Sequence, residues 1–162
     1  FRYMGLAVFP KILLTTPHIT SIDLSNNCLK KLPNLRDLVN LKVLTLQCNL
    51  LDDRTIFRLP KDLDAIDLDN NKLTKFPNFS GCGALRFITI SRNQIESIPS
   101  DLSLPNLNRL NILDNPVTQN RSHLTRVINS GDLSAHAMFT LDENDHIYRQ
   151  KPVRKRTDLY QH

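Results

Sequence analysis

Residues 41–51 read LKVLTLQCNLL, with leucine at the first, fourth, sixth and eleventh positions and asparagine at the ninth. This pattern, LxxLxLxxNxL, returns every 22 residues along the chain. Alternating apolar residues in LxL are typical of a short strand that has one face in a core. A fixed internal period indicates coils that stack and share a continuous hydrophobic interior. The sequence therefore predicts an α/β right-handed solenoid with a concave parallel β-sheet.

The asparagine of the pattern is predicted to be structural. A buried amide can both donate and accept hydrogen bonds, so it can satisfy backbone groups where the chain turns away from the strand. Stacking the coils would place these side chains in one ladder. Its members are Asn27, Asn49, Asn71, Asn93 and Asn115.

The repeats divide the chain. Residues 1–117 hold five full repeats and a partial N-terminal one, in which Phe1, Met4, Leu6 and Phe9 fit the frame one residue out of step. Because Phe1 enters partway through a repeat, we expect preceding residues or a neighbouring molecule to cover that edge.

A different pattern follows Asn115. Apolar residues at 124, 127 and 128 predict a helix, with Asn120 or Ser122 as N-cap and Gly131 at the C-terminus. Residues 118–142 are therefore predicted to form a C-terminal helical cap, completed by Leu133, Phe139 and Leu141. Residues 143–162 are predicted to be a flexible basic tail.

Composition excludes several classes of protein. The chain has 162 residues and a net charge of +5, and five bases between 149 and 156 account for the whole excess. No apolar run is long enough to cross a bilayer, so no membrane contact is expected. Three cysteines without paired spacing argue against a disulfide framework or zinc site. They are predicted to be buried, reduced side chains of an intracellular protein.

These residues identify the chain as similar to the leucine-rich repeat family, in its intracellular subclass with 22-residue repeats. The segment 112–118, ILDNPVT, together with Val127-Ile128 and Leu141-Asp142, resembles the cap of the A-prime type of spliceosomal subunit, from the small nuclear ribonucleoprotein that recognises the branch site. Residues 63–67 also resemble a strand of that type.

The spliceosomal resemblance implies a function. It implies a nuclear, non-catalytic adaptor whose concave face holds a helix of an RNA-recognition-motif protein and helps it to hold snRNA. The alternative is a general intracellular scaffold, or a phosphatase or cytoskeletal regulator, with no RNA role.

Partner-binding residues are expected where strand side chains point away from the core. Phe87 is the predicted aromatic anchor, with small apolar neighbours at 43 and 65 and bases toward the C-terminal end. An alternative is that Phe87 only shields the sheet. The candidate partner-binding residues are Asp23, Thr45, Gln47, Asp67, Asp69, Phe87, Thr89, Arg92, Arg109 and Asn111.

No catalytic, cofactor or metal site is predicted. Asp67 and Asp69 share a face of one strand at a distance that paired-carboxylate chemistry could use. No histidine, glycine-rich turn or second acidic cluster is placed by the sequence to complete such a site. An electrostatic contact for a basic partner is the favoured interpretation.

The basic tail has three interpretations. Lys151, Arg154, Lys155 and Arg156 match a nuclear-import signal, and they could also contact an RNA backbone. The third interpretation is a solvated charge run.

Overall fold

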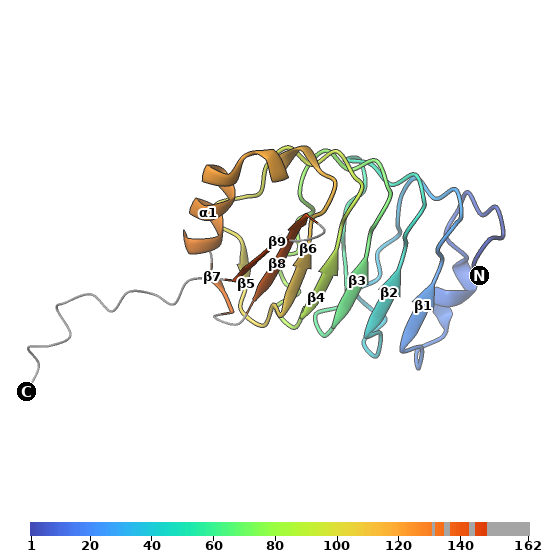
Figure 1. Ribbon diagram of the computed structural model, residues 1–162. Helices are drawn as coiled ribbons and strands as arrows, with labels where there is room; N and C mark the ends of the chain where they lie inside the picture. Colours follow the sequence, from blue (N-terminus) through green and yellow to red (C-terminus); the bar gives the residue numbers. More distant parts are fainter. Residues whose placement is uncertain (131, 135–136, 143–144, 149–162) are drawn as a thin grey trace, which may run out of the picture.

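Each repeat contributes one three-residue strand and returns through an irregular segment. In a computed structural model, which describes residues 1–130, 132–134, 137–142 and 145–148, the coils stack with their strands along one side (Figure 1). The elements are η1 (Lys11–Thr15), β1 (Ser21–Asp23), β2 (Val43–Thr45), β3 (Ala65–Asp67), β4 (Phe87–Thr89), β5 (Ser103–Leu104), β6 (Arg109–Asn111), η2 (Pro116–Gln119), α1 (Arg121–Ser130), β7 (Asp132–Leu133), β8 (Met138–Asp142) and β9 (Asp145–Tyr148).

The strands form a seven-stranded sheet in the order β1-β2-β3-β4-β6-β8-β9. Pairing is parallel from β1 to β8, and only the last pair, β8 with β9, is antiparallel. Across β1 to β4 and β6, residues 22 apart lie opposite one another, because every repeat has the same length. The predicted parallel-sheet solenoid with a helix near the C-terminus is confirmed.

The core follows the leucine frame. The middle residue of each repeat strand is at most 2% exposed, as at Ile66 and Ile88, while the residues on either side face outward. Leucines and isoleucines of successive coils continue this interior along the solenoid. No single coil could bury such a surface alone, so the stacking stabilises the fold.

The predicted asparagines occupy one column, and each amide joins its own coil to the preceding one. The Nδ2 group of Asn71 donates to the carbonyl oxygens of Leu46 and Leu68, at 3.0 and 3.1 Å. Its Oδ1 accepts a hydrogen bond from the backbone N–H of Leu51, at 3.0 Å. The other repeats use the same pattern, so the ladder consists of side-chain to backbone bonds.

The C-terminal cap combines the predicted helix with strands. Asn120 is the N-cap, since its Oδ1 accepts from the His123 N–H at 3.1 Å. The ring Nε2 of His123 accepts from the Ile98 N–H, which ties α1 to the last coil. Leu124, Val127 and Ile128 are buried as predicted. Gly131 lies outside the described residues.

Strands join the helix at the predicted cap. Leu133, Phe139 and Leu141 are buried as expected, but they lie on β7 and β8. The first of these strands pairs with β5 in a separate two-stranded sheet, and β8 extends the large sheet itself. The sheet continues through β9, which lies within the segment predicted as a tail. The remaining predicted tail, residues 149–162, lies outside the described residues.

The cysteine prediction is wrong for two of the three residues. Cys82 is buried, but Cys28 is exposed and Cys48 is only partly buried. Cys28 directly follows a ladder asparagine, where the neighbouring repeats carry Leu50 and Lys72, so this position faces outward. Among the described residues, no helix is both long and apolar enough to cross a membrane.

Candidate protein-binding site

The sheet face, made of the first and third residues of the repeat strands and the residues that follow them, carries the predicted partner-binding side chains. The pairing register aligns these positions into two columns. The first column is Ser21, Val43, Ala65, Phe87 and Arg109. The second column is Asp23, Thr45, Asp67, Thr89 and Asn111.

Strand β8 continues both columns, which the sequence analysis did not foresee. Met138 lies opposite Arg109, and Thr140 lies opposite Asn111. The signal was available in the alternation of Phe139 and Leu141, which put their neighbours on the other face of the same strand.

An apolar strip runs along the first column. Val43 is 38% exposed, and Ala65 and Phe87 are partly buried beside it. The Arg86 guanidinium lies 5.4 Å from the centroid of the Phe87 ring. Its Nη2 also pairs with Asp64 Oδ2 at 2.9 Å. These contacts hold the aromatic ring in place, so it loses little conformational freedom when a partner covers it.

Two carboxylates occupy the centre of the sheet face. Asp67 Oδ1 accepts from the Asp69 N–H at 2.9 Å and from Thr89 Oγ1 at 3.0 Å. Asp69 Oδ1 accepts from the Ser91 N–H at 2.7 Å. Burial raises the pKa of Asp69, and the neighbouring charge of Asp67 raises it further, against the lowering effect of its hydrogen bonds. Among the described residues, neither carboxylate forms an ion pair with a basic side chain.

In the part of the chain that the structure describes, Asp67 and Asp69 belong to no group of three or more histidine, cysteine or acidic residues placed to hold a metal ion. Their oxygens accept hydrogen bonds from backbone and hydroxyl donors instead. The arrangement presents negative charge to a basic group of a partner.

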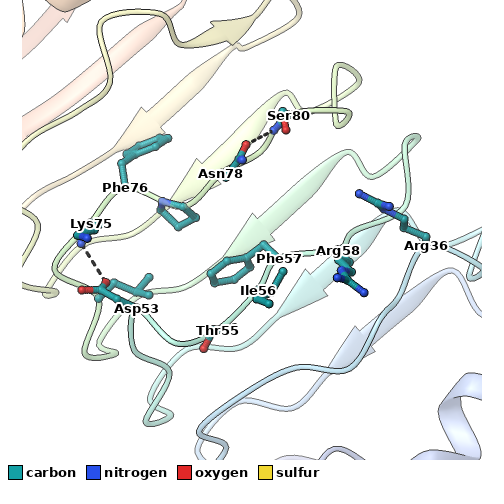
Figure 2. Close-up of a pocket in the computed structure, with 12 residues that line it drawn as sticks. Arg36, Asp53, Thr55, Ile56, Phe57, Arg58, Lys75, Phe76, Asn78 and Ser80 are labelled. Atoms are coloured by element: carbon teal, nitrogen blue, oxygen red, sulfur yellow. Dashed lines mark hydrogen bonds between the residues drawn. The ribbon is translucent and has the colours of Figure 1, made fainter.

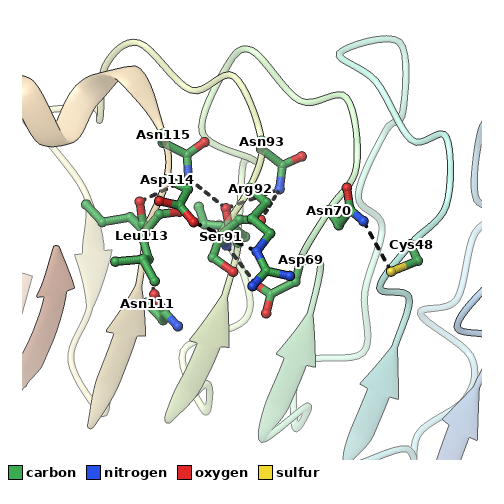
Figure 3. A network of polar contacts seen from close by, with 12 residues as sticks. Cys48, Asp69, Asn70, Ser91, Arg92, Asn93, Asn111, Leu113, Asp114 and Asn115 are labelled. Carbon is green, nitrogen blue, oxygen red and sulfur yellow. Dashed lines mark hydrogen bonds and ion pairs between the residues drawn. The ribbon is translucent and has the colours of Figure 1, made fainter. Parts of the chain in front are cut away.

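A third column follows the strands at Ser25, Gln47, Asp69, Ser91 and Leu113. Gln47 and Asp69 are half-buried, whereas Ser25 and Ser91 are buried. The predicted residue Asp69 is therefore partly accessible to solvent and lies among polar groups (Figure 3).

The residue just before each ladder asparagine has left-handed backbone geometry, a feature that sequence reasoning missed. Arg92 has φ of 53°, and the equivalent residues Asn26, Cys48, Asn70 and Asp114 have φ between 53° and 57°. Asparagine and aspartate tolerate this region better than other residues. Their recurrence at this position was a usable signal. Arg92 therefore lies on a turn, where its Nε is 3.8 Å from Asp114 Oδ2 (Figure 3).

The remaining predicted residues lie along the sheet or outside the described residues. Arg109 is exposed at the C-terminal end of the strip, and Asp23 lies at the opposite end of the sheet on β1. Lys151, Arg154, Lys155 and Arg156 lie outside the described residues. The structure thus brings together Asp67, Asp69, Phe87, Thr89 and Arg109 across β3, β4 and β6.

The equal register of the repeat strands and the asparagine column define the architecture. Residues 39–95 match the family model described as "Leucine rich repeat". This part of the chain is therefore similar to leucine-rich repeats. No curated protein is similar enough to count as a match.

Two solved structures share this leucine-rich repeat fold. An internalin of Listeria monocytogenes is 22% identical with a TM-score of 0.53, over 78% of this chain and 38% of that one. A leucine-rich repeat protein of Leptospira interrogans is 21% identical with a TM-score of 0.55, over 79% of this chain and 40% of that one. The chain therefore spans less than half the length of either protein.

Proposed function

We propose that this leucine-rich repeat protein is a non-catalytic adaptor that binds a protein partner on its sheet face. The observation that carries the proposal is the strip of Val43, Ala65 and Phe87, in register on adjacent strands, with unpaired carboxylates on one side and Arg109 at its end. An aromatic anchor among small side chains, with charged groups around it, is typical of the centre of a protein interface.

The chemistry of the sheet face favours binding over catalysis. Five of its polar side chains are hydrogen-bonded to one another or to the backbone: Asp23, Asp67, Asp69, Thr89 and Asn111. Such contacts fix the orientation of the side chains and make a preformed surface, which lowers the entropic cost of association.

The finer proposal is that the partner is an RNA-recognition-motif protein of a nuclear small nuclear ribonucleoprotein. Its support is the likeness of residues 112–118 and of the apolar positions in α1 and β8 to the spliceosomal cap. In this proposal a partner helix lies along the sheet face. The basic segment from Lys151 to Arg156 contacts the RNA backbone or serves nuclear import.

A capture experiment tests both levels of the proposal. The intact chain is immobilised and exposed to nuclear extract with and without nuclease. We expect an RNA-recognition-motif protein to be retained after nuclease treatment. Phe87→Ala and Arg109→Glu should each weaken its retention while leaving thermal unfolding nearly unchanged.

The matched control is Val39→Ala, which removes apolar surface from an exposed residue outside the strands. Recovery of only a phosphatase or cytoskeletal protein would overturn the spliceosomal proposal but keep the adaptor. Equal retention by Phe87→Ala, Arg109→Glu and the wild type would overturn the sheet-face site itself.

A further inference from the structure

A cavity of about 350 Å³ opens between the second and third coils, among the irregular segments rather than on the sheet face. One wall of the cavity consists of residues 53, 55–58 and 73. The opposite wall consists of residues 75–78 and 80. Arg36 reaches it from the first coil (Figure 2). None of its lining residues belongs to the predicted partner-binding set.

The cavity arises where the second repeat departs from the others. The fifth residue after the ladder asparagine is apolar and buried in the first, third and fourth repeats, at Leu32, Phe76 and Ile98, and a proline follows it. The second repeat has Arg54 and Thr55 at these two positions.

The backbone of the second repeat accommodates this change. The Arg54 side chain is 82% exposed, while Thr55 turns inward and its Oγ1 donates to the Lys30 carbonyl oxygen. Ile56 is consequently 65% exposed beside the cavity. The departure thus leaves a hollow and an apolar side chain at its wall.

The cavity also gathers positive charge. Arg36 and Arg58 occupy the same position in adjacent repeats. Their backbone segments are neighbours, because the Leu35 N–H donates to the Arg58 carbonyl oxygen at 2.8 Å. Within the described residues, neither guanidinium forms an ion pair. Both side chains lie at the same end of the cavity (Figure 2), so an anion bound there would be attracted by two positive charges.

The one carboxylate in the lining does not neutralise these arginines. Asp53 Oδ1 accepts from the backbone N–H groups of Thr74 and Lys75, at 2.9 and 3.0 Å, and its Oδ2 accepts from the Thr74 hydroxyl. Burial raises the pKa of Asp53, but these bonds lower it below its ordinary value, so the carboxylate stays ionised. Figure 2 places Asp53 and Lys75 at one end of the cavity and the two arginines at the other.

We propose that this cavity binds an acidic peptide segment of a second protein, with a carboxylate between Arg36 and Arg58 and an adjoining apolar side chain against Ile56 and Phe57. Guanidinium groups bind carboxylates through paired hydrogen bonds, which favours this match of charge. A small free anion would leave the apolar wall uncovered, whereas an acidic residue next to a leucine would fill both parts. The protein would then join two partners, one on the sheet face and one at this cavity.

In the test, the intact chain is titrated with an acetylated, amidated peptide of sequence Gly-Ser-Glu-Leu-Glu-Ser-Gly. The chemical shifts of the protein are followed by NMR. We expect saturable shifts at the cavity residues that weaken as salt is added. The double variant Arg36→Gln/Arg58→Gln should lose affinity by about tenfold or more, in line with the loss of charge-assisted hydrogen bonds. The matched control is Lys11→Gln/Arg126→Gln, which removes two exposed cations outside both proposed sites and should bind like the wild type.

Two further arms identify the ligand class. A peptide with glutamine in place of glutamate should bind poorly, and Ile56→Ser should weaken the acidic peptide without changing the response to inorganic phosphate. The proposal is overturned if the control variant loses affinity equally, if the glutamine peptide binds as well, if phosphate binds and the peptide does not, or if no saturable shift occurs. Thermal unfolding of each variant verifies that the fold is intact.

Discussion

The first and last coils that the structure describes are covered to different extents. At the C-terminal end, α1, β7 and β8 lay buried apolar side chains over the last coil, including Leu124, Leu133 and Phe139. At the N-terminal end, residues 1–9 reproduce the turn of a repeat but add no strand beside β1 within the described residues. Tyr3 and Val8 are 71% and 70% exposed there. A coil is therefore stabilised by what covers it, and we expect the N-terminal turn to be the first part to open.

The N-terminal turn still follows the repeat geometry. Tyr3 has φ of 56°, as in the corresponding turn residues of later coils. Asn27 Oδ1 accepts from the backbone N–H groups of Met4 and Leu6, at 3.1 and 2.9 Å. The ladder thus reaches this edge even though the apolar cover does not.

The largest expected effect is at the cap. Phe139→Ala should lower the free energy of unfolding by about 3–5 kcal/mol, because it opens a cavity between β8 and the last coil. Val8→Ala at the opposite end should change it by less than about 0.5 kcal/mol, since that side chain is already exposed. Denaturant unfolding measures both. Similar losses for the two variants would contradict the difference between the ends.

The ladder asparagines give the next largest effect. Asn71→Ala should cost about 1–3 kcal/mol, because buried backbone groups on two coils lose their partners. Asn27→Ala should cost less, since two of its partners belong to the exposed N-terminal turn. Thermal and denaturant unfolding compare the two variants. An unchanged free energy of unfolding for Asn71→Ala would show that its hydrogen bonds do not stabilise the fold.

A smaller effect is expected from the left-handed turn positions. Arg92→Asn should stabilise the protein by about 0.5 kcal/mol, because asparagine adopts this backbone region more readily than arginine. The exposed pair with Asp114 contributes little to offset the gain. Tyr3→Asn should show less benefit in global unfolding, because its turn opens early. A destabilised Arg92→Asn variant would show that the ion pair outweighs the backbone preference.

The smallest effect depends on pH and contrasts Asp69 with Asp23. The raised pKa of Asp69 means that its ionisation opposes folding, so Asp69→Asn should modestly stabilise the protein at neutral pH. That gain should shrink as the pH falls through the folded pKa and vanish below the ordinary value of 3.8, where the acid is protonated in both states.

Asp23 should behave in the opposite way. Burial raises its pKa, but hydrogen bonds from Ser25 and the charge of Arg2 lower it overall. Its ionised form therefore stabilises the fold above the ordinary value of 3.8, and this contribution is lost as the pH falls through the folded pKa. Asp23→Asn should destabilise the protein modestly at neutral pH and have no effect in strong acid. Identical pH profiles for the two variants would contradict the assignment.

The 22-residue periodicity predicted the features that recur in every repeat and missed the features that occur only once. The strands, their register and the asparagine column depend on one 22-residue frame, so counting was enough to align Val43, Ala65 and Phe87. The exposure of Cys28 and Cys48 was missed because cysteine was treated by residue type rather than by position in the repeat.

The cap and the cavity depend on contacts that no local pattern contains. Strand β8 pairs with β6 from 29 residues away, a spacing outside the frame. The departure at Arg54 and Thr55 is visible in the sequence, but whether the chain closes over the gap or leaves it open depends on the path of the neighbouring coils. The electrostatics of Asp69 likewise depend on the carboxylate and hydroxyls that the sheet brings beside it.

Site-specific photo-cross-linking tests most directly whether a protein partner lies on the sheet face. A benzophenone side chain is introduced at Thr89 on β4, or at Val39 outside the strands, and each protein is irradiated with nuclear extract. The proposed adaptor predicts a cross-linked partner from position 89 and none of the same protein from position 39. A partner captured from position 39 and not from position 89 would contradict it.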